Sequence, residues 1–194
     1  ALARHNLASA LQARGRTAEA LDSFQQAVTL DPSFTASHFD LAQTAAESGN
    51  SKLAEQHYRT VINLDPAHGK AHLYLGNTLF QQEKFAESLQ HLHESVRHLP
   101  DSPIAHNSLG VALRQQNQLE EARAHLEKAT SLDPESADAW FNLAEVLSGL
   151  GKTEESRHAY QQAHRLLPRD SWKAQHIQKI LNERDGSKRP LGTS

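Results

Sequence analysis

The segment AHGKAH, residues 67–72, places two histidines, His68 and His72, four residues apart. On one helix this spacing puts both imidazoles on the same face, an arrangement that suits a metal ion. The chain holds 13 histidines among 194 residues, so metal binding is the first chemistry to consider. Whether the two rings can act together depends on where the helices begin, which the rest of the sequence indicates.

Histidines recur at a fixed interval elsewhere in the chain. Two columns repeat at every thirty-fourth position: His38, His72 and His106, and His57, His91 and His125. Neighbouring packed helices lie roughly 8–10 Å apart, and a closed tetrahedral site needs further ligands that no pattern supplies. Duplication of a repeat explains both columns, so the sequence predicts no metal site and no cofactor. Histidine-based metal binding stays open as an alternative.

Composition excludes several classes of protein. The chain lacks cysteine, which rules out disulfides and thiolate sites. The 20 basic and 23 acidic residues are well mixed, so we expect no nucleic-acid partner. No apolar run approaches the roughly 18 residues of a membrane span, so we expect no membrane insertion and no signal peptide. The chain also lacks methionine, from which we infer an excerpt of a longer protein. Its compartment is unassigned, with the cytoplasm favoured over the periplasm or secretion.

The chain is built from five tandem units of equal length. Five prolines mark them: Pro32, Pro66, Pro100, Pro134 and Pro168. The units 1–34, 35–68, 69–102, 103–136 and 137–170 align without gaps, and we number the positions of each unit from 1. Position 7 is always leucine, position 8 is glycine or alanine, position 20 is alanine or serine, and position 24 is large. A constant period of this kind indicates a repeat architecture.

The recurring columns describe two amphipathic helices in each unit. Positions 4, 7, 8 and 11 form one face of a first helix, and positions 20, 24 and 27 form one face of a second. Position 15 is glycine or asparagine in four units, which suits a left-handed helix end. The proline near position 32 stops the second helix. Ser102 before Pro103 predicts an N-cap followed by proline at the first helical position.

The columns resemble those of the tetratricopeptide repeat (TPR) family over residues 1–170. The resemblance implies an all-α fold, a right-handed α-α superhelix of about eleven helices. We expect a single solenoid over 1–184, with a capping helix at 171–184 that has a polar outer face. A flexible tail is expected at 185–194. In this family the first helices line a concave side, where an extended peptide or a partner helix binds.

Candidate binding residues come from the first-helix positions that face this groove. Asn6 and Asn142 at position 6 resemble the asparagine ladder of superhelical TPR proteins such as the O-linked N-acetylglucosamine transferases. Side-chain amides there bind the peptide backbone, because an amide both donates and accepts. Asp40, Tyr74 and Ser108 interrupt the ladder, and simple solvation of these residues stays an alternative. The candidate residues are Asn6, Asp40, Gln43, Lys70, Tyr74, Asn77, Phe80, Gln81, Ser108, Arg114 and Asn142.

Two further features bear on what the groove can bind. No register supplies the two-Lys, two-Asn, one-Arg clamp of co-chaperone TPR domains, so a chaperone C-terminal carboxylate tail is excluded as the partner. Asp40 would repel such a carboxylate. Phe39, Phe141 and Phe80 are either apolar anchors for a ligand or packing residues between repeats.

The sequence therefore predicts a non-catalytic scaffold that binds a protein or peptide partner in its groove. A Gly-rich phosphate loop, a GxSxG motif and an HExxH motif are all absent. One alternative is a substrate-recruiting arm of a larger enzyme, for instance a glycosyltransferase or a hydroxylase. Self-association through the terminal repeats stays open as well.

Overall fold

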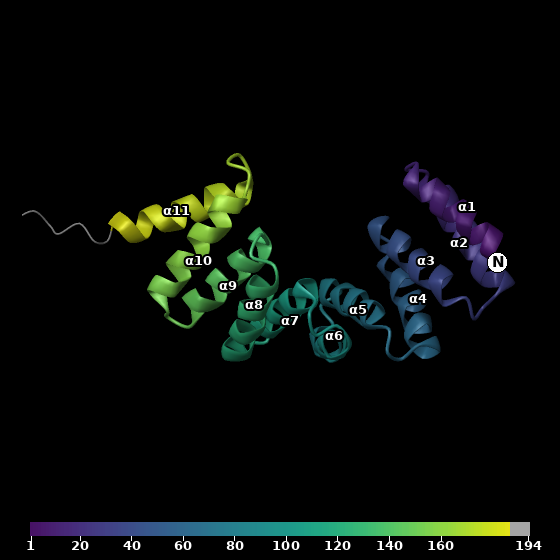
Figure 1. The fold of residues 1–194 in the computed structure, drawn as a ribbon, viewed down its shortest axis with the longest axis horizontal. Coiled ribbons are helices and arrows are strands. Elements are labelled where there is room, and N and C mark those ends of the chain that lie inside the picture. The colour runs from purple at the N-terminus through teal and green to yellow at the C-terminus, as the bar shows by residue number, and fades with distance from the viewer. Residues whose placement is uncertain (187–194) are drawn as a thin grey trace, which may run out of the picture. The chain divides into compact units, whose positions relative to one another are not determined.

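The computed structural model describes residues 1–186, which form eleven α-helices and no strand (Figure 1). The helices are α1 (Leu2–Ala13), α2 (Thr17–Leu30), α3 (Thr35–Glu47), α4 (Ser51–Leu64), α5 (Gly69–Gln81), α6 (Phe85–His98), α7 (Pro103–Gln115), α8 (Leu119–Leu132), α9 (Ala137–Gly149), α10 (Thr153–Leu166) and α11 (Trp172–Gly186). Each repeat thus supplies one first helix and one second helix. The all-α helical-repeat fold predicted from the sequence is confirmed.

The described helices fall into two compact units, divided after residue 100. The first contains α1–α6 and the second contains α7–α11. Within each unit a helix packs most extensively on its partner in the same repeat, and next on the first helix of the following repeat. The capping helix predicted at 171–184 corresponds to α11, while residues 187–194 of the predicted tail lie outside the described residues.

The turn inside each repeat has a left-handed residue at position 15. The backbone angle φ is +73° at Gly15, +82° at Gly49, +72° at Gly151 and +59° at Asn117. Glu83 adopts φ +62° at the same position, although a side chain with a Cβ is strained there. The repeat therefore imposes this conformation even where the residue is unfavourable for it.

Small residues at position 8 allow the two helices of a repeat to approach closely. A Cβ placed on Gly76 would lie only 2.7 Å from Cγ of Leu92 on α6. The Ser88 hydroxyl, at position 20, donates a 2.7 Å hydrogen bond to the Gly76 carbonyl. Ser156 bonds the carbonyl of Ala144 in the same way at 2.9 Å. The serines at position 20 thus join the helices through the backbone that the small residue leaves accessible.

Side-chain caps start several first helices. Ser102 accepts a hydrogen bond from the Ala105 amide, and Pro103 is the first residue of α7, as the sequence predicts. His68 is the N-cap of α5, and its Nδ1 accepts from the Ala71 amide at 3.1 Å. His72 lies inside the same helix and is buried. The two histidines of AHGKAH therefore have separate structural roles.

Candidate functional site

Successive first helices contact one another through a row of polar and aromatic side chains. In the first unit, Nε2 of His5 lies 3.8 Å from an Asp40 carboxylate oxygen. In the second unit, Asn142 on α9 donates a 2.9 Å hydrogen bond to Asn107 on α7. We call the surface formed by positions 2, 6, 9, 12 and 13 of the first helices the first-helix face. All eleven candidate residues lie on it.

The first unit holds eight of these residues, on α1, α3 and α5. Asp40, Gln43, Tyr74, Asn77 and Phe80 are half-buried, whereas Asn6, Lys70 and Gln81 are exposed. Gln43 donates to the Glu47 carboxylate at 3.4 Å, and Gln12 on α1 donates to it at 3.4 Å as well. The amide side chains of this unit thus surround carboxylates rather than one another.

An aromatic cluster lies beneath this part of the first-helix face. The Phe39 ring makes edge contacts with Tyr58 and Tyr74, both with centroids 5.8 Å apart, and a tilted contact with His68 at 5.0 Å. The rings of Tyr58 and Tyr74 are stacked at 6.0 Å. Phe39 thus packs between repeats. Phe80 instead contacts Phe85 of its own repeat at 5.3 Å.

Tyr58, at position 24 of its repeat on α4, is 1% exposed and its hydroxyl has no hydrogen-bond partner. Burial raises the pKa of this phenol, with further contributions from Tyr74, Glu47 and Asp40. An unpartnered buried hydroxyl costs roughly 1–3 kcal/mol. Sequence reasoning missed Tyr58 because position 24 is a packing position in every repeat. The sequence distinguishes Tyr58 in one respect, because only repeats 2 and 5 carry tyrosine at position 24.

The carboxylates near Tyr58 have few cationic neighbours. Burial raises the pKa of Asp40, and the neighbouring His5 opposes this only in part. His5 is itself held by Ser37, with Nδ1 at 3.0 Å from the hydroxyl. Glu47 is bonded to the two glutamine amides described above. This region therefore combines an unpaired hydroxyl with carboxylates that can accept hydrogen bonds or a cation.

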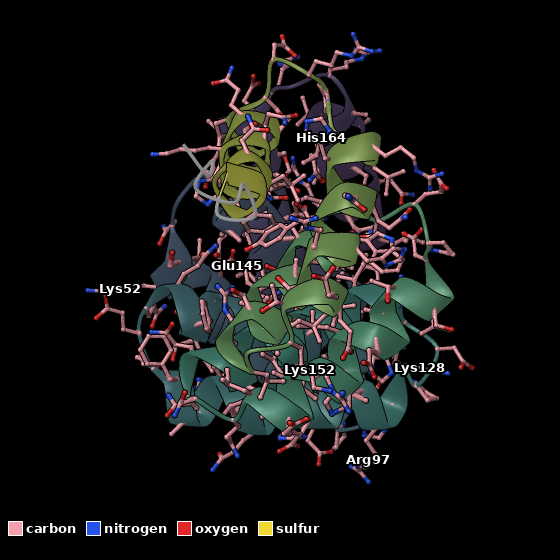
Figure 2. The ribbon with its side chains drawn as sticks, turned by 90° about the vertical axis from the view of Figure 1, so that its left-hand side faces the viewer. Lys52, Arg97, Lys128, Glu145, Lys152 and His164 are labelled. Atoms are coloured by element: carbon pink, nitrogen blue, oxygen red, sulfur yellow. The ribbon has the colours of Figure 1, made fainter. Side chains whose placement is uncertain are left out.

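On the first-helix face of the second unit, more of the polar side chains form ion pairs or hydrogen bonds with other residues of the same unit. Arg114 on α7 forms an ion pair with Glu145 on α9 at 3.6 Å, and Glu145 also accepts a hydrogen bond from the Tyr160 hydroxyl. Glu145 is labelled in Figure 2. Lys173 on α11 pairs with Asp138. Tyr160 occupies the position of Tyr58, so the same hydroxyl has a partner in one unit and lacks one in the other.

Two more candidate binding residues belong to the second unit, Asn142 and Ser108. Asn142 already donates to Asn107, which reduces what its amide can offer to a ligand. Ser108 is half-buried on α7. Phe141 packs against Tyr160 at 6.1 Å and His176 at 6.4 Å, which is the packing role between repeats.

The two histidine columns meet inside each repeat rather than between repeats. The Nδ1 atoms are 2.9 Å apart in His38–His57, 3.0 Å in His72–His91 and 3.0 Å in His106–His125. The ring centroids are 5.0–5.2 Å apart, so the two nitrogens of each pair point nearly at one another. We call these the histidine pairs. Each joins the first helix of a repeat to its second helix.

The backbone determines the tautomer of the first histidine in two pairs. Nε2 of His38 lies 3.0 Å from the Pro32 carbonyl, which can only accept, so Nε2 carries the proton. Nδ1 of neutral His38 therefore accepts, and Nδ1 of His57 donates. The same bond links His72 to the Pro66 carbonyl at 3.2 Å.

Both rings of a pair cannot be charged while this hydrogen bond persists. Burial, together with His38, lowers the pKa of His57 to about 4. Burial also lowers the pKa of His72 and of His91. Trp140 replaces the first histidine in repeat 5, and its indole donates to the Pro134 carbonyl at 2.9 Å. Ala159 replaces the second histidine.

No cluster within residues 1–186 brings three or more His, Asp or Glu side chains together as a metal ion would require. None of the helices in this part of the chain is both long and apolar enough to cross a bilayer.

Stacked helix pairs with a first-helix face define a helical-repeat protein of the TPR class. Tetratricopeptide repeat models match residues 5–69, 39–103 and 137–170, and a TPR repeat model matches residues 110–151. The chain belongs to the tetratricopeptide repeat family. No curated protein matches it.

Several solved structures share this fold. PilF of Pseudomonas aeruginosa has a TM-score of 0.79 and 22% identity, covering 94% of this chain and 85% of its own. MamA of Desulfovibrio magneticus RS-1 has a TM-score of 0.77 and 21% identity, covering 84% and 92%. YrrB, described as a TPR protein with an unusual peptide-binding site, has a TM-score of 0.75 and 22% identity, covering 91% and 90%. At these identities the likeness shows the fold alone.

Proposed function

We propose that this chain is a non-catalytic interaction scaffold that binds an extended peptide on the first-helix face of residues 1–100. The observation that carries the proposal is the row of half-buried side chains on this face: Asp40, Gln43, Tyr74 and Asn77. Together they offer donors, acceptors and an aromatic ring on one surface.

These side chains suit an extended backbone. Gln43 and Asn77 can each donate and accept, so they pair with peptide groups regardless of sequence. Asp40 accepts from a backbone N–H or from a basic side chain of the ligand. Tyr74 offers a half-buried ring on which a ligand side chain packs. The peptide-binding site named for the structurally similar YrrB supports this kind of activity.

A peptide library tests the proposal whatever the identity of the natural partner. Random twelve-residue peptides are selected on the full chain, and the affinities of the selected peptides are measured by fluorescence anisotropy. We expect Asp40→Asn and Tyr74→Ala each to weaken binding by about tenfold, equal to 1.4 kcal/mol. Lys52→Ala is the control, because this exposed lysine on α4 extends away from the helices (Figure 2).

The opposite pattern would overturn the proposal. Peptides that bind equally well to both first-helix variants, but lose affinity when α4 or α6 is altered, would place binding on the second helices. Arg114→Ala distinguishes the two units, because binding on residues 1–100 predicts little effect of this change.

A further inference from the structure

A cavity of about 420 Å³ lies between α8 and α10 in the second unit. Its apolar lining comes mainly from α9, where Trp140, Leu143 and Leu147 contribute. Three carboxylates also line it: Glu127 from α8, and Glu154 and Glu155 from α10. His158 lines it as well, and its ring makes an edge contact with Trp140, with centroids 6.1 Å apart. We call it the α8–α10 cleft. It shares no residue with the first-helix face.

The corresponding space two repeats earlier in the chain can be compared with this cleft. The equivalent space between α4 and α6 holds a cavity of only about 160 Å³. There the histidine pair His72–His91 occupies positions 4 and 23. In the α8–α10 cleft these positions carry Trp140 and Ala159. The small side chain of Ala159 leaves the space that an imidazole fills in the other repeat.

The charged side chains around these two cavities also differ. Between α4 and α6, the Arg59 guanidinium lies 2.6 Å from Glu87 and 2.9 Å from Glu55, so it bridges the two second helices. At the equivalent positions two repeats later, Glu127 replaces Arg59 and Glu155 replaces Glu87. The positions that form an ion pair in one cleft therefore carry two carboxylates in the other. Arg123 stands at the position of Glu55, so the guanidinium and the carboxylate have exchanged positions on α8.

Glu127 and Glu155 each form a long ion pair with a cationic side chain that lies near them in the sequence. Arg123 approaches Glu127 at 3.7 Å along α8. Lys152, which precedes α10 and is labelled in Figure 2, approaches Glu155 at 3.7 Å. These separations exceed the 2.6 and 2.9 Å around Arg59, so the two ion pairs are looser. An incoming cation can therefore compete for both carboxylates.

We propose that the α8–α10 cleft binds an arginine side chain of a partner polypeptide. The guanidinium pairs with Glu127 and Glu155, which line the cleft from α8 and α10. The aliphatic stem packs on Leu143 and Leu147. Arginine fits better than lysine because its planar group pairs with two carboxylates and stacks on an aromatic face. The indole of Trp140 is held in place by its bond to the Pro134 carbonyl.

Nuclear magnetic resonance on the full chain tests this binding site. The probe is N-acetyl-arginine methylamide, and the observed signals are the two indole N–H resonances. Trp140 lies in the cleft, whereas Trp172 is 67% exposed at the start of α11 and serves as the internal control. We expect a saturable shift of the Trp140 resonance and none of the Trp172 resonance.

Matched probes and variants establish the chemistry. The neutral citrulline analogue and the lysine analogue should each bind at least fivefold more weakly. The double variant Glu127→Gln with Glu155→Gln should weaken arginine binding at least fivefold, with helix content checked by circular dichroism. Ala159→His, which restores the residue found at this position in repeats 2–4, should fill the cavity and prevent binding.

Several results would overturn the proposal. These are no saturable shift at Trp140, equal binding of the citrulline or lysine analogue, or unchanged affinity in the folded double variant. Should Ala159→His fail to fold, Leu143→Phe is the second cavity-filling variant, and unchanged binding by it would also exclude the cleft.

Discussion

The buried Tyr58 hydroxyl gives the sharpest contrast at the scale of single residues, because Tyr160 occupies the equivalent position with a partner. Removing the hydroxyl in Tyr58→Phe eliminates an unsatisfied polar group, so we expect stability to rise by about 1 kcal/mol. Tyr160→Phe instead removes the bond to Glu145, so we expect stability to fall by about 1 kcal/mol. Urea unfolding of the two variants measures the difference.

Agreement in sign between the two tyrosine variants would contradict this account. A loss of stability in Tyr58→Phe would mean that the hydroxyl has a partner, such as a bound water. Because both hydroxyls are buried, neither variant should weaken binding of the selected peptides.

Single residues also show where sequence reasoning succeeds. A small residue recurs at position 8, which predicts close helix contact at Gly76, and its neighbour Leu92 indeed leaves no space for a side chain. Gly15 and Asn117 are predicted in left-handed turns on conformational grounds, and both are found there. Glu83 could not be foreseen, because only the repeat context forces its backbone into that region.

The histidine pairs operate at the scale of helix pairs. A ring whose pKa is lowered by folding is neutral in the native state and binds a proton more readily in the unfolded state. Stability from His57 is therefore complete above its unfolded pKa of about 6.5 and declines as the pH falls toward the native value of about 4. We expect Tm to fall between pH 7 and pH 5 by at least about 3 °C, which corresponds to roughly 1 kcal/mol.

Repeat 5 supplies the matched control for this pH dependence. The double variant His38→Trp with His57→Ala copies Trp140 and Ala159 and keeps a donor for the Pro32 carbonyl. We expect its Tm to decline less than that of the original chain over the same pH range. Parallel Tm curves for the two proteins would exclude the pair as the source.

The sequence predicts which helix faces carry the histidine columns, but it does not predict which histidines pair with each other. Periodicity places each column on a helix face and suggests comparing equal positions in adjacent repeats. The structure instead joins positions 4 and 23 within one repeat, 19 residues apart. The angle between the two helices decides this pairing, and periodicity alone does not specify that angle. One feature of the sequence did indicate the pairing: in repeat 5 both histidines are replaced together, by Trp140 and Ala159.

For the whole molecule, the repeat period determines the number and order of helices, whereas the candidate site is only partly predictable. The eleven candidates share five positions of the first helices by choice, and the structure shows that their pairing differs between residues 1–100 and the second unit. Arg114 and Asn142 are engaged with Glu145 and Asn107, and such bonds depend on side-chain conformations. Whether a groove residue is available to a ligand therefore requires the structure.

The division into two units leads to a final prediction about folding and binding together. Residues 1–100 contain three complete helix pairs with their own buried core, including Phe24, Leu41, Tyr58 and Leu75. Repeat stability is approximately the sum of the repeats and their nearest-neighbour interfaces, and residues 1–100 hold the three repeats that such a core requires as a minimum. We therefore expect a polypeptide of residues 1–100 to be helical and to unfold cooperatively.

Such a polypeptide also separates the two binding surfaces. We expect it to bind peptides selected on the full chain within about threefold of the full-chain affinity, since Asp40, Gln43 and Tyr74 are all present. A polypeptide of residues 101–186 is the matched control, and it should bind the arginine probe but not these peptides. A folded 1–100 polypeptide that bound the peptides more than tenfold more weakly would show that the second unit contributes contacts. The first-helix face of residues 1–100 would then be insufficient for binding.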